Sequence, residues 1–288
     1  MHPTRPLEAV LDAIAGWASD HGVEVGQVRI DGQTRVVADA VEAADCELLV
    51  AVGGDGTTLA ALHEGAAGSR PVLGIACGSV GALTSVAADE ARSALDAVAE
   101  GRWASLELPG LEVAWPSGPA AVAINDFAVI RAGSGQVQVS VSVDDVLYAA
   151  LAGDGLVVAT PFGSSAYTMA AGGPVLAPGA EGMAITPLAP HGGCAPPLVA
   201  GSASRLSLAV EPGYGGVRYE VDGRRIETDT HELEVGMSAN YATLARLAQE
   251  EPRLTGLRRR GLVLDSPRVL VRQASLHDIR LPGVPPSP

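Results

Sequence analysis

The sequence predicts an α/β protein with two parts: an N-terminal Rossmann-like domain on an open parallel sheet and a mostly antiparallel, β-rich C-terminal domain. Three observations lead to this prediction. Buried apolar runs alternate with helix-like segments up to about residue 104, as in a doubly wound sheet. Apolar and polar residues then alternate between about 105 and 240, which is typical of antiparallel strands. The length of 288 residues favours two domains over one.

The first domain, residues 1–104, is expected to alternate helices and strands. Apolar residues at helical spacing predict helices over 7–20, 34–44, 57–66 and 88–100. Apolar runs predict strands over 23–25, 47–52 and 71–76. Gly22 and Gly101 are placed to end the first and last of these helices.

The second domain, residues 105–240, is expected to consist mostly of strands separated by Gly, Pro and Asp-Gly. Alternating or apolar runs predict strands at 121–124, 136–143, 156–159, 205–210, 217–221 and 231–235. The remaining residues, 241–288, combine a helical pattern with a strand at 269–271. We expect them to pack back on the body of the protein and to end in a frayed, Pro-rich stretch at 282–288.

The basic residues are unusual in kind, because all 19 are Arg and none is Lys, and the net charge is −14. A Walker A loop, the strand lysine of protein kinases and a pyridoxal Schiff base all need Lys, so these chemistries are excluded. The negative charge disfavours nucleic acid as a partner, since its binding needs a basic face. Any phosphoryl chemistry must rely on Arg, metal ions and backbone amides.

Cellular location is indicated by what the chain contains and lacks. No apolar run approaches the roughly 18 residues of a membrane helix, and the N-terminus lacks the apolar core of a signal peptide. The three cysteines, Cys46, Cys77 and Cys194, are scattered and form no metal-ligand pattern. The sequence therefore predicts a cytoplasmic protein without a membrane partner.

A glycine-rich turn follows the apolar run at 48–52. It has the sequence Gly-Gly-Asp-Gly-Thr at 53–57 and precedes a helix-compatible segment. Its backbone amides and Thr hydroxyls suit phosphate. Because a bare phosphate repels Asp55, this carboxylate suggests metal ligation or proton abstraction. The alternative is a structural turn, in which the glycines allow positive φ and Asp55 caps the helix.

Two further segments place polar residues at strand ends. Residues 153–167 combine a buried strand with a hydroxyl-rich turn that includes Thr160 and Ser165, and Asn125-Asp126 closes another apolar run. Ligands of open sheets bind at the carboxyl ends of strands, so the two strand–turn–helix units suggest a shared cleft between the domains. A hydroxyl-rich N-cap and an ordinary Asn-Asp turn are the structural alternatives.

In order and spacing, the three motifs resemble those of the NAD kinase family. That family shows Gly-Gly-Asp-Gly-Thr, then Asn-Glu or Asn-Asp, then Asp-Gly, an apolar strand and Thr-Pro-Thr-Gly-Ser-Thr-Ala-Tyr. The last segment, here 160–167, is the most selective, since diacylglycerol kinases, sphingosine kinases and related phosphofructokinases share the first motif. The resemblance runs from about residue 4 to about residue 270, and 221–224 looks like the family's later Asp-Gly turn.

The resemblance implies phosphorylation of the 2′-hydroxyl of the adenosine ribose of NAD. The donor is ATP or, in some members, polyphosphate, used with Mg²⁺ or another divalent cation. Asp55 would take or position the hydroxyl proton, which suits a placed carboxylate in phosphoryl transfer. NAD and ATP are then the ligands of this chain, and the resemblance also implies a homodimer or a homotetramer.

The resemblance further assigns a set of substrate-binding residues, each matched to a family motif. The set comprises Gly54, Gly56 and Thr57 for the ribose and phosphates; Asn125, Ser165 and Tyr167 for the adenine; Asp126 for the ribose hydroxyls; Asp154 and Ala166 near the nicotinamide end; and Thr160 in the hydroxyl-rich turn.

The chain departs from the family pattern at three places. Ala82 stands where the family has an aromatic of the nucleotide pocket, and Phe162 replaces a small hydroxyl residue. The two changes either refill one pocket or reshape it for another acceptor, since an uncompensated ring loss costs about 1 kcal/mol or more. The apolar strand that usually precedes a turn like 2–5 is missing; either the start was assigned too late, or a sheet edge or a gap is expected.

Two other functions stay open. The first is a NAD-kinase-like enzyme that phosphorylates a different nucleoside or metabolite hydroxyl, as Ala82 and Phe162 suggest. The second is a non-catalytic nucleotide-binding regulator. The intact Asp55, Asn125 and Asp126 argue against that regulator, because decay usually begins with the chemical carboxylate.

Overall fold

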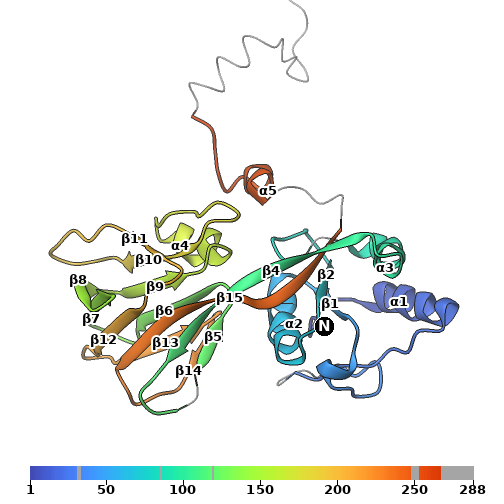
Figure 1. Cartoon of the computed structure of the whole chain (residues 1–288), viewed down its shortest axis with the longest axis horizontal. Helices are drawn as coiled ribbons and strands as arrows, with labels where there is room; N and C mark the ends of the chain where they lie inside the picture. Colours follow the sequence, from blue (N-terminus) through green and yellow to red (C-terminus); the bar gives the residue numbers. More distant parts are fainter. Residues whose placement is uncertain (31–33, 85, 119, 248–252, 267–288) are drawn as a thin grey trace, which may run out of the picture. The chain divides into compact units, whose positions relative to one another are not determined.

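The computed structural model describes residues 1–30, 34–84, 86–118, 120–247 and 253–266 (Figure 1). The chain divides into two compact units, Met1–Glu250 and Glu251–Pro288. Every described strand and every predicted site residue belongs to the first unit. The second unit contributes the described helix α5 (Arg253–Arg259). The predicted strand at 269–271 and the predicted frayed end at 282–288 lie outside the described residues.

The N-terminal part is a parallel sheet with helices on both faces. Strands β1 (Leu49–Gly53) and β2 (Val72–Ala76) pair in parallel, and β3 (Val86–Ala87) pairs in parallel with β2. Helix α2 (Asp55–Gly68) packs in one apolar cluster, and α1 (Glu8–His21) and α3 (Ala91–Ala99) pack in another. Neighbouring residues of β1 face opposite clusters, Ala51 toward α2 and Val52 toward α1 and α3. The predicted open parallel sheet is confirmed.

The rest of the first unit is antiparallel, which confirms the predicted β-rich part. Its strands in the first sheet are β4 (Trp103–Ala114), β5 (Ala121–Ala123), β7 (Val137–Val143), β8 (Val146–Gly153), β12 (Leu206–Glu211) and β15 (Glu232–Leu247). Those of a second sheet are β6 (Asp126–Arg131), β9 (Gly155–Ala159), β10 (Gly182–Leu188), β11 (Leu198–Gly201), β13 (Val217–Val221) and β14 (Arg224–Ile226). Trp115, Phe127 and Tyr219 make ring contacts in the apolar core that residues of both sheets share.

The long strand β15 joins the parallel part to the antiparallel part. It pairs antiparallel with β4, with a register shift between Ser238 and Ala242. Near its end it pairs in parallel with β2 through Leu244 and Val72. Within the described ranges one sheet therefore continues in the order β1-β2-β15-β12-β7-β8, with β3, β4 and β5 attached. This continuity ties the strands that end near Asp55 to the β-rich part.

Two elements predicted near the N-terminus do not form. Residues 23–25 are not a strand, and 34–44 contain no α-helix. Ala40 forms an isolated bridge with Gln27, and the 3₁₀ turn Ala43–Asp45 begins at the end of the range. The second error has a physical cause, because the buried side chain of Gln27 satisfies a non-helical backbone there. Its oxygen accepts the N–H of Val37 at 2.8 Å, and its amide donates to the carbonyl of Arg35 at 2.8 Å.

Among the described strands, β1 stands at the end of the sheet order. The N–H of His2 donates to the carbonyl of Val52 at 2.8 Å, so the first residues run beside this edge. The Nδ1 atom of His2 accepts the N–H groups of Thr4 at 3.3 Å and Arg5 at 3.2 Å. These bonds close a turn that carries Arg5 to the carboxyl ends of β1 and β2.

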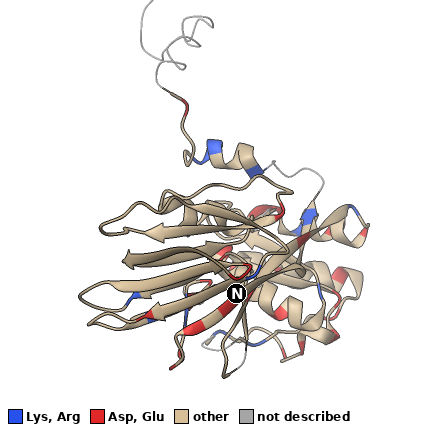
Figure 2. Ribbon diagram, turned by 60° about the vertical axis from the view of Figure 1, so that its left-hand side comes forward, with Lys and Arg blue, Asp and Glu red and all other residues tan. Residues whose placement is uncertain are grey.

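The charged residues are scattered along the described ribbon. Figure 2 shows Arg and acidic positions spread over many elements of the described ribbon. Ion pairs such as Arg102–Glu100 and Arg205–Glu234 lie at exposed positions, where such pairs contribute little to stability. The described helices are all too short or too polar to cross a membrane.

Candidate active site

Asp55 is the first residue of α2 and follows the N-cap residue Gly54. Its Oδ2 accepts the N–H of Ala82 at 2.8 Å, and its Oδ1 accepts the N–H of Leu83 at 2.9 Å. A helix N-terminus favours a carboxylate, because the aligned peptide dipoles place partial positive charge there. Each carboxylate oxygen has two acceptor positions. These bonds therefore fix the side chain and leave it able to accept a proton.

Asp222, in the turn between β13 and β14, holds the segment 124–126. Its carboxylate accepts three consecutive backbone N–H groups, from Ile124 at 2.8 Å, Asn125 at 2.7 Å and Asp126 at 3.1 Å. The Asp222 side chain is only 3% exposed, so these donors have no competing water. Asp222 is not among the site residues predicted from the sequence. The one sequence feature that marks it is the Asp-Gly turn at 222–223.

The turn that follows β9 packs directly on the same segment. The hydroxyl of buried Thr160 donates to the carbonyl of Ile124 at 2.6 Å and accepts the N–H of Gly163 at 2.9 Å. The N–H of Thr160 donates to the carbonyl of Asn125 at 2.9 Å. A Cβ atom at Gly163 would overlap the backbone of Asn125, so the close approach requires glycine. These contacts give Thr160 a positioning role.

Asp126 lies in an acidic and largely buried environment. Burial raises its pKa to about 7, the carboxylates of Asp222 and Glu220 add to the rise, and a hydrogen bond from the backbone N–H of Tyr167 opposes it. A carboxyl group that is half protonated near neutral pH can donate as well as accept a hydrogen bond. That property suits a group facing sugar hydroxyls.

The raised pKa of Asp126 should make the folded chain less stable as the pH rises from about 4 to about 7. The carboxyl ionises near 3.8 when unfolded but near 7 when folded, so the folded chain holds an extra proton across this window. The free energy of unfolding should fall by up to about 1.4 kcal/mol per pH unit. Asp126→Asn should remove this fall, and exposed Asp89→Asn should retain it. Melting temperatures across the window check this, and equal slopes for Asp126→Asn and wild type would contradict it.

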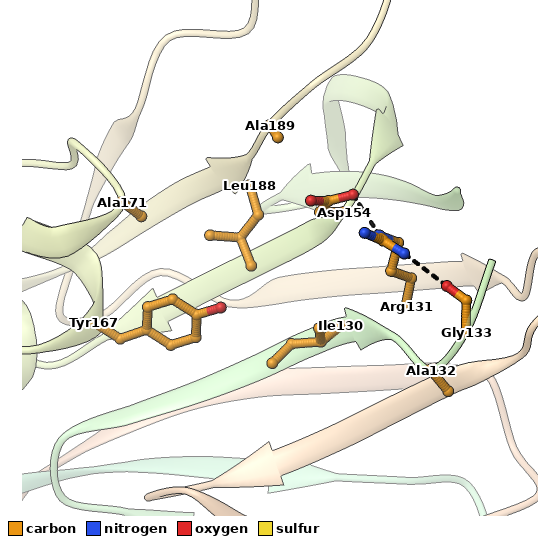
Figure 3. Close-up of a pocket in the computed structure, with 9 residues that line it drawn as sticks. All are labelled: Ile130, Arg131, Ala132, Gly133, Asp154, Tyr167, Ala171, Leu188 and Ala189. Atoms are coloured by element: carbon orange, nitrogen blue, oxygen red, sulfur yellow. Dashed lines mark hydrogen bonds and ion pairs between the residues drawn. The ribbon is translucent and has the colours of Figure 1, made fainter. Parts of the chain in front are cut away.

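A cavity of about 520 Å³ lies beside Tyr167 (Figure 3). Arg131 and Asp154 line it as an ion pair, with 2.5 Å between Nε and Oδ1. Figure 3 shows the Tyr167 ring, Ile130 and Leu188 converging on one side of the cavity and the ion pair on the other. An apolar wall with a few polar groups is typical of a small-ligand pocket. Arg131 was not selected from the sequence, because nothing local marks it as the partner of Asp154.

The predicted residues fall into two groups. The first is the turn around Asp55, in which Gly56 is exposed and Thr57 is half-buried. The second joins the segment 124–126 to the turn at 160–167 and, through the cavity, to Asp154. In this turn Ser165 is half-buried, whereas Ala166 and Tyr167 are exposed. Asp55 and Asn125 are not among the residues that line the cavity.

A shared apolar cluster connects the two groups. It includes Leu83, whose N–H binds Asp55, and Ile124, which precedes Asn125. Phe162 is buried in the same cluster, and partly buried Ala82 packs against it. The family has an aromatic ring at the position of Ala82, and here the ring of Phe162 lies in the same cluster. This favours the view that Phe162 fills the space that the smaller Ala82 leaves.

Arg5 lies beside the glycine turn of Asp55. Its Nη1 donates to the carbonyl of Cys77 at 2.6 Å, just after β2. A Cβ atom on Gly54 would lie 4.0 Å from the same nitrogen. The sequence has no Lys, so positive charge at such a site must come from Arg. The guanidinium of Arg5 supplies it at the carboxyl ends of β1 and β2. Sequence reasoning did not select it.

The described ranges contain no preformed site for a divalent cation, because no three His, Cys, Asp or Glu side chains lie close enough together to hold one. Magnesium in phosphoryl transfer is usually held by one or two carboxylates together with the substrate phosphates. Asp55 is the carboxylate of the glycine turn. A cation bound beside it would have to take its other ligands from the phosphates of a substrate and from water.

Comparison with known proteins finds related sequences for both parts of the first unit. Residues 11–103 match the ATP-NAD kinase N-terminal domain, and residues 124–247 match the ATP-NAD kinase C-terminal domain. The NAD kinase of Halorubrum lacusprofundi is 34% identical over 231 residues, which cover 78% of this chain and 82% of that protein. The NAD kinase of Chlorobaculum tepidum is 34% identical over 181 residues, which cover 62% of this chain and 63% of that protein. The chain thus spans slightly less than two thirds of the second relative.

The fold is also found among solved structures. The crystal structure of yeast NADH kinase complexed with NADH aligns with a TM-score of 0.74 and 22% identity, covering 92% of this chain and 86% of that one. The two domain matches include the turn of Asp55 and the segments at 124–126 and 160–167. The chain belongs to the NAD kinase family.

Proposed function

We propose that this chain is a NAD kinase, which transfers a phosphoryl group from ATP to the 2′-hydroxyl of the adenosine ribose of NAD and so forms NADP. The observation that carries the proposal is the Asp55 carboxylate, fixed at the start of α2 by the amides of Ala82 and Leu83. Such a carboxylate beside a phosphate-binding turn suits phosphoryl transfer to an alcohol. The match to both ATP-NAD kinase domains supports ATP as the donor and NAD as the acceptor.

In the proposed reaction, Asp55 takes or orients the proton of the 2′-hydroxyl, and the oxygen of that hydroxyl attacks the terminal phosphorus of ATP. The bond from that phosphorus to ADP breaks as the new ester bond forms. Gly54, Gly56 and Thr57 contact the ribose and the phosphates, and Arg5 offsets the negative charge of the donor. A divalent cation such as Mg²⁺ supplies further charge neutralisation when it is bound with the phosphates.

The acceptor is proposed to lie along the second group of residues. The assignments are Asn125, Ser165 and Tyr167 for the adenine, Asp126 for the ribose hydroxyls, and Asp154 and Ala166 for the nicotinamide end. The buried Asp126 and the exposed ring of Tyr167 support these roles, because one offers a sugar partner and the other a stacking surface. Thr160 acts indirectly, by holding Asn125.

A second candidate function is phosphorylation of a different nucleoside or metabolite hydroxyl. Its motivation is that Phe162 and Ala82 depart from the family pattern in the same cluster as Leu83, whose N–H donates to Asp55; if the two changes do not compensate fully, the pocket is reshaped for another acceptor. Polyphosphate likewise stays a candidate donor. A third possibility, a regulator that binds nucleotide without turnover, conflicts with the intact Asp55.

Mass spectrometry of the product separates these functions. Purified chain is incubated with NAD, Mg²⁺ and either ATP or polyphosphate, and NADH and adenosine serve as other acceptors. Conversion of NAD to NADP supports the proposal and identifies the donor. Consumption of ATP on another alcohol, with NAD unchanged, would support the second candidate. Tight NAD binding without turnover for any donor or metal would support the regulator.

Gly81 provides a test of the Asp55 geometry that changes no charge. A Cβ atom at this position would overlap the Asp55 carboxylate, so Gly81→Ala should displace it. A misplaced catalytic group should lower kcat/KM at least about tenfold, with little change in melting temperature. Gly236→Ala is the control, because a Cβ atom there meets no neighbouring atom. Steady-state kinetics and thermal melts check this, and an unchanged kcat/KM in Gly81→Ala would contradict it.

We also propose a cytoplasmic location and a homodimer or homotetramer. Cys46, Cys77 and Cys194 form no disulfide, which fits a reducing compartment. Membership of the family supports the assembly. Light scattering on the purified chain checks it, and a mass equal to a single chain at micromolar concentration would contradict it.

A further inference from the structure

A hydrogen-bonded chain of three side chains connects α2, the β13–β14 turn and β15. The Nε2 atom of His63, on α2, lies 2.8 Å from Oδ2 of Asp222. The Nδ1 atom of the same ring lies 3.1 Å from the hydroxyl oxygen of Tyr241, on β15. The two rings meet edge to face, with centroids 5.7 Å apart. Residues distant in sequence therefore converge on one histidine.

The donors and acceptors among these three side chains can be assigned by starting from Asp222. Its carboxylate faces the amides of 124–126 and acts as an acceptor, so Nε2 of His63 must carry the hydrogen. In the neutral ring Nδ1 is then an acceptor, and the hydroxyl of Tyr241 donates to it. His63 thus donates through Nε2 and accepts at Nδ1, and the two bonds together fix the orientation of its ring.

The three hydrogen-bonded side chains join the two groups of proposed site residues. His63 lies a little over two turns after Asp55, and both residues belong to the one continuous helix α2. Asp222 fixes the amides of Asn125 and Asp126, the proposed acceptor-binding residues. The bond between His63 and Asp222 therefore connects the helix of the proposed base to the segment that holds the acceptor.

We propose that His63, Asp222 and Tyr241 form a latch that sets the acceptor-binding segment relative to Asp55. They are positioning residues, since none of them is assigned a contact with substrate. The inference rests on the proposed function and adds residues that none of the three sequence motifs contains. A merely structural role would lower stability without changing the affinity of the folded protein for NAD.

The latch predicts a selective effect on the acceptor. His63→Ala removes a hydrogen bond to a charged group, so the KM and Kd for NAD should rise about tenfold. The KM for ATP should stay within about twofold, because the turn of Asp55 keeps its own bonds to Ala82 and Leu83. His63→Gln, whose amide can still donate to Asp222, should restore most of the affinity for NAD. Tyr241→Phe should fall between the two.

The measurements are steady-state kinetics for each substrate, calorimetric NAD binding, and hydrogen exchange of a peptide that covers 124–126. Exchange at 124–126 should be faster in His63→Ala and near wild type in His63→Gln. His21→Ala, which loses a bond to the Trp17 carbonyl on α1, is the control and should change none of these quantities.

Two results would overturn the latch: an unchanged KM and Kd for NAD in folded His63→Ala, or unchanged exchange at 124–126. If His63→Ala does not fold, Tyr241→Phe decides instead: an unchanged Kd for NAD together with unchanged exchange at 124–126 in that variant would overturn the latch. Absence of NADP formation by the wild-type chain overturns the proposed function instead. The latch is then judged on NAD binding and on exchange, so the two failures are distinguishable.

Discussion

Asp55→Asn should lower kcat by about 100- to 10,000-fold, the range that a positioned general base contributes. The carboxamide cannot take the hydroxyl proton, whereas the proposed acceptor-binding residues at 124–126 and 160–167 are unchanged. NAD should therefore bind with nearly wild-type affinity. Single-turnover kinetics and calorimetric NAD binding on the same preparation check both parts, and near-normal turnover would remove Asp55 from the mechanism.

This variant needs a control, because Asn offers one acceptor oxygen where Asp55 accepts two backbone N–H groups. A rate loss could then come from a displaced loop. Thr84→Val tests this. The Thr84 hydroxyl accepts the N–H of Gly81 at 2.7 Å and lies 3.5 Å from Oδ1 of Asp55, so the change disturbs the loop and one long contact while the Asp55 carboxylate stays in the chain. We expect less than about a tenfold loss for Thr84→Val. A loss equal to that of Asp55→Asn would assign the effect to the loop.

Asp222→Asn should have the largest effect on stability. Its carboxylate is almost fully buried and accepts three backbone N–H groups and the imidazole of His63. A carboxamide turns an N–H₂ group toward some of these donors and leaves them unpaired. The free energy of unfolding should fall by about 3 kcal/mol or more. Urea unfolding at neutral pH measures the change.

Asp144→Asn is a matched control for this substitution. Asp144 also adopts positive φ, at 49° against 51° for Asp222, and its carboxylate also accepts a backbone N–H, from Arg205. It differs in being exposed, so water can replace the lost bond. We expect a loss of less than about 1 kcal/mol. Equal losses for the two variants would contradict the role given to burial at Asp222.

The fold could be predicted because its signals are local. The apolar runs that became β1 and β2, and the alternation that became β7 and β12, each lie within a few residues of sequence. The signal for Asp55 is local as well, because its glycine neighbours mark it as the candidate catalytic residue. The segment 34–44 shows the limit, since the side chain of Gln27 satisfies its backbone and overrides the helical spacing.

The parts of the site that escaped prediction depend on distant contacts. Asp222 lies 97 residues from Asn125, and His63 lies 159 residues from Asp222. Arg131 lies 23 residues before Asp154. It ends β6, whereas Asp154 stands between β8 and β9. No local pattern marks a lone His, Arg or Asp as the partner of a residue so far away. Only the fold brings these pairs together.

A crystal structure of the chain with NAD bound tests the proposed chemistry most directly. If Asp55 is the base, one of its carboxylate oxygens should lie about 2.6–3.2 Å from the 2′-oxygen of the adenosine ribose, directly or through one water. The adenine should then lie against Asn125 and Tyr167. NAD bound with its 2′-oxygen out of reach of Asp55, or with the other ribose facing that carboxylate, would contradict the assignment.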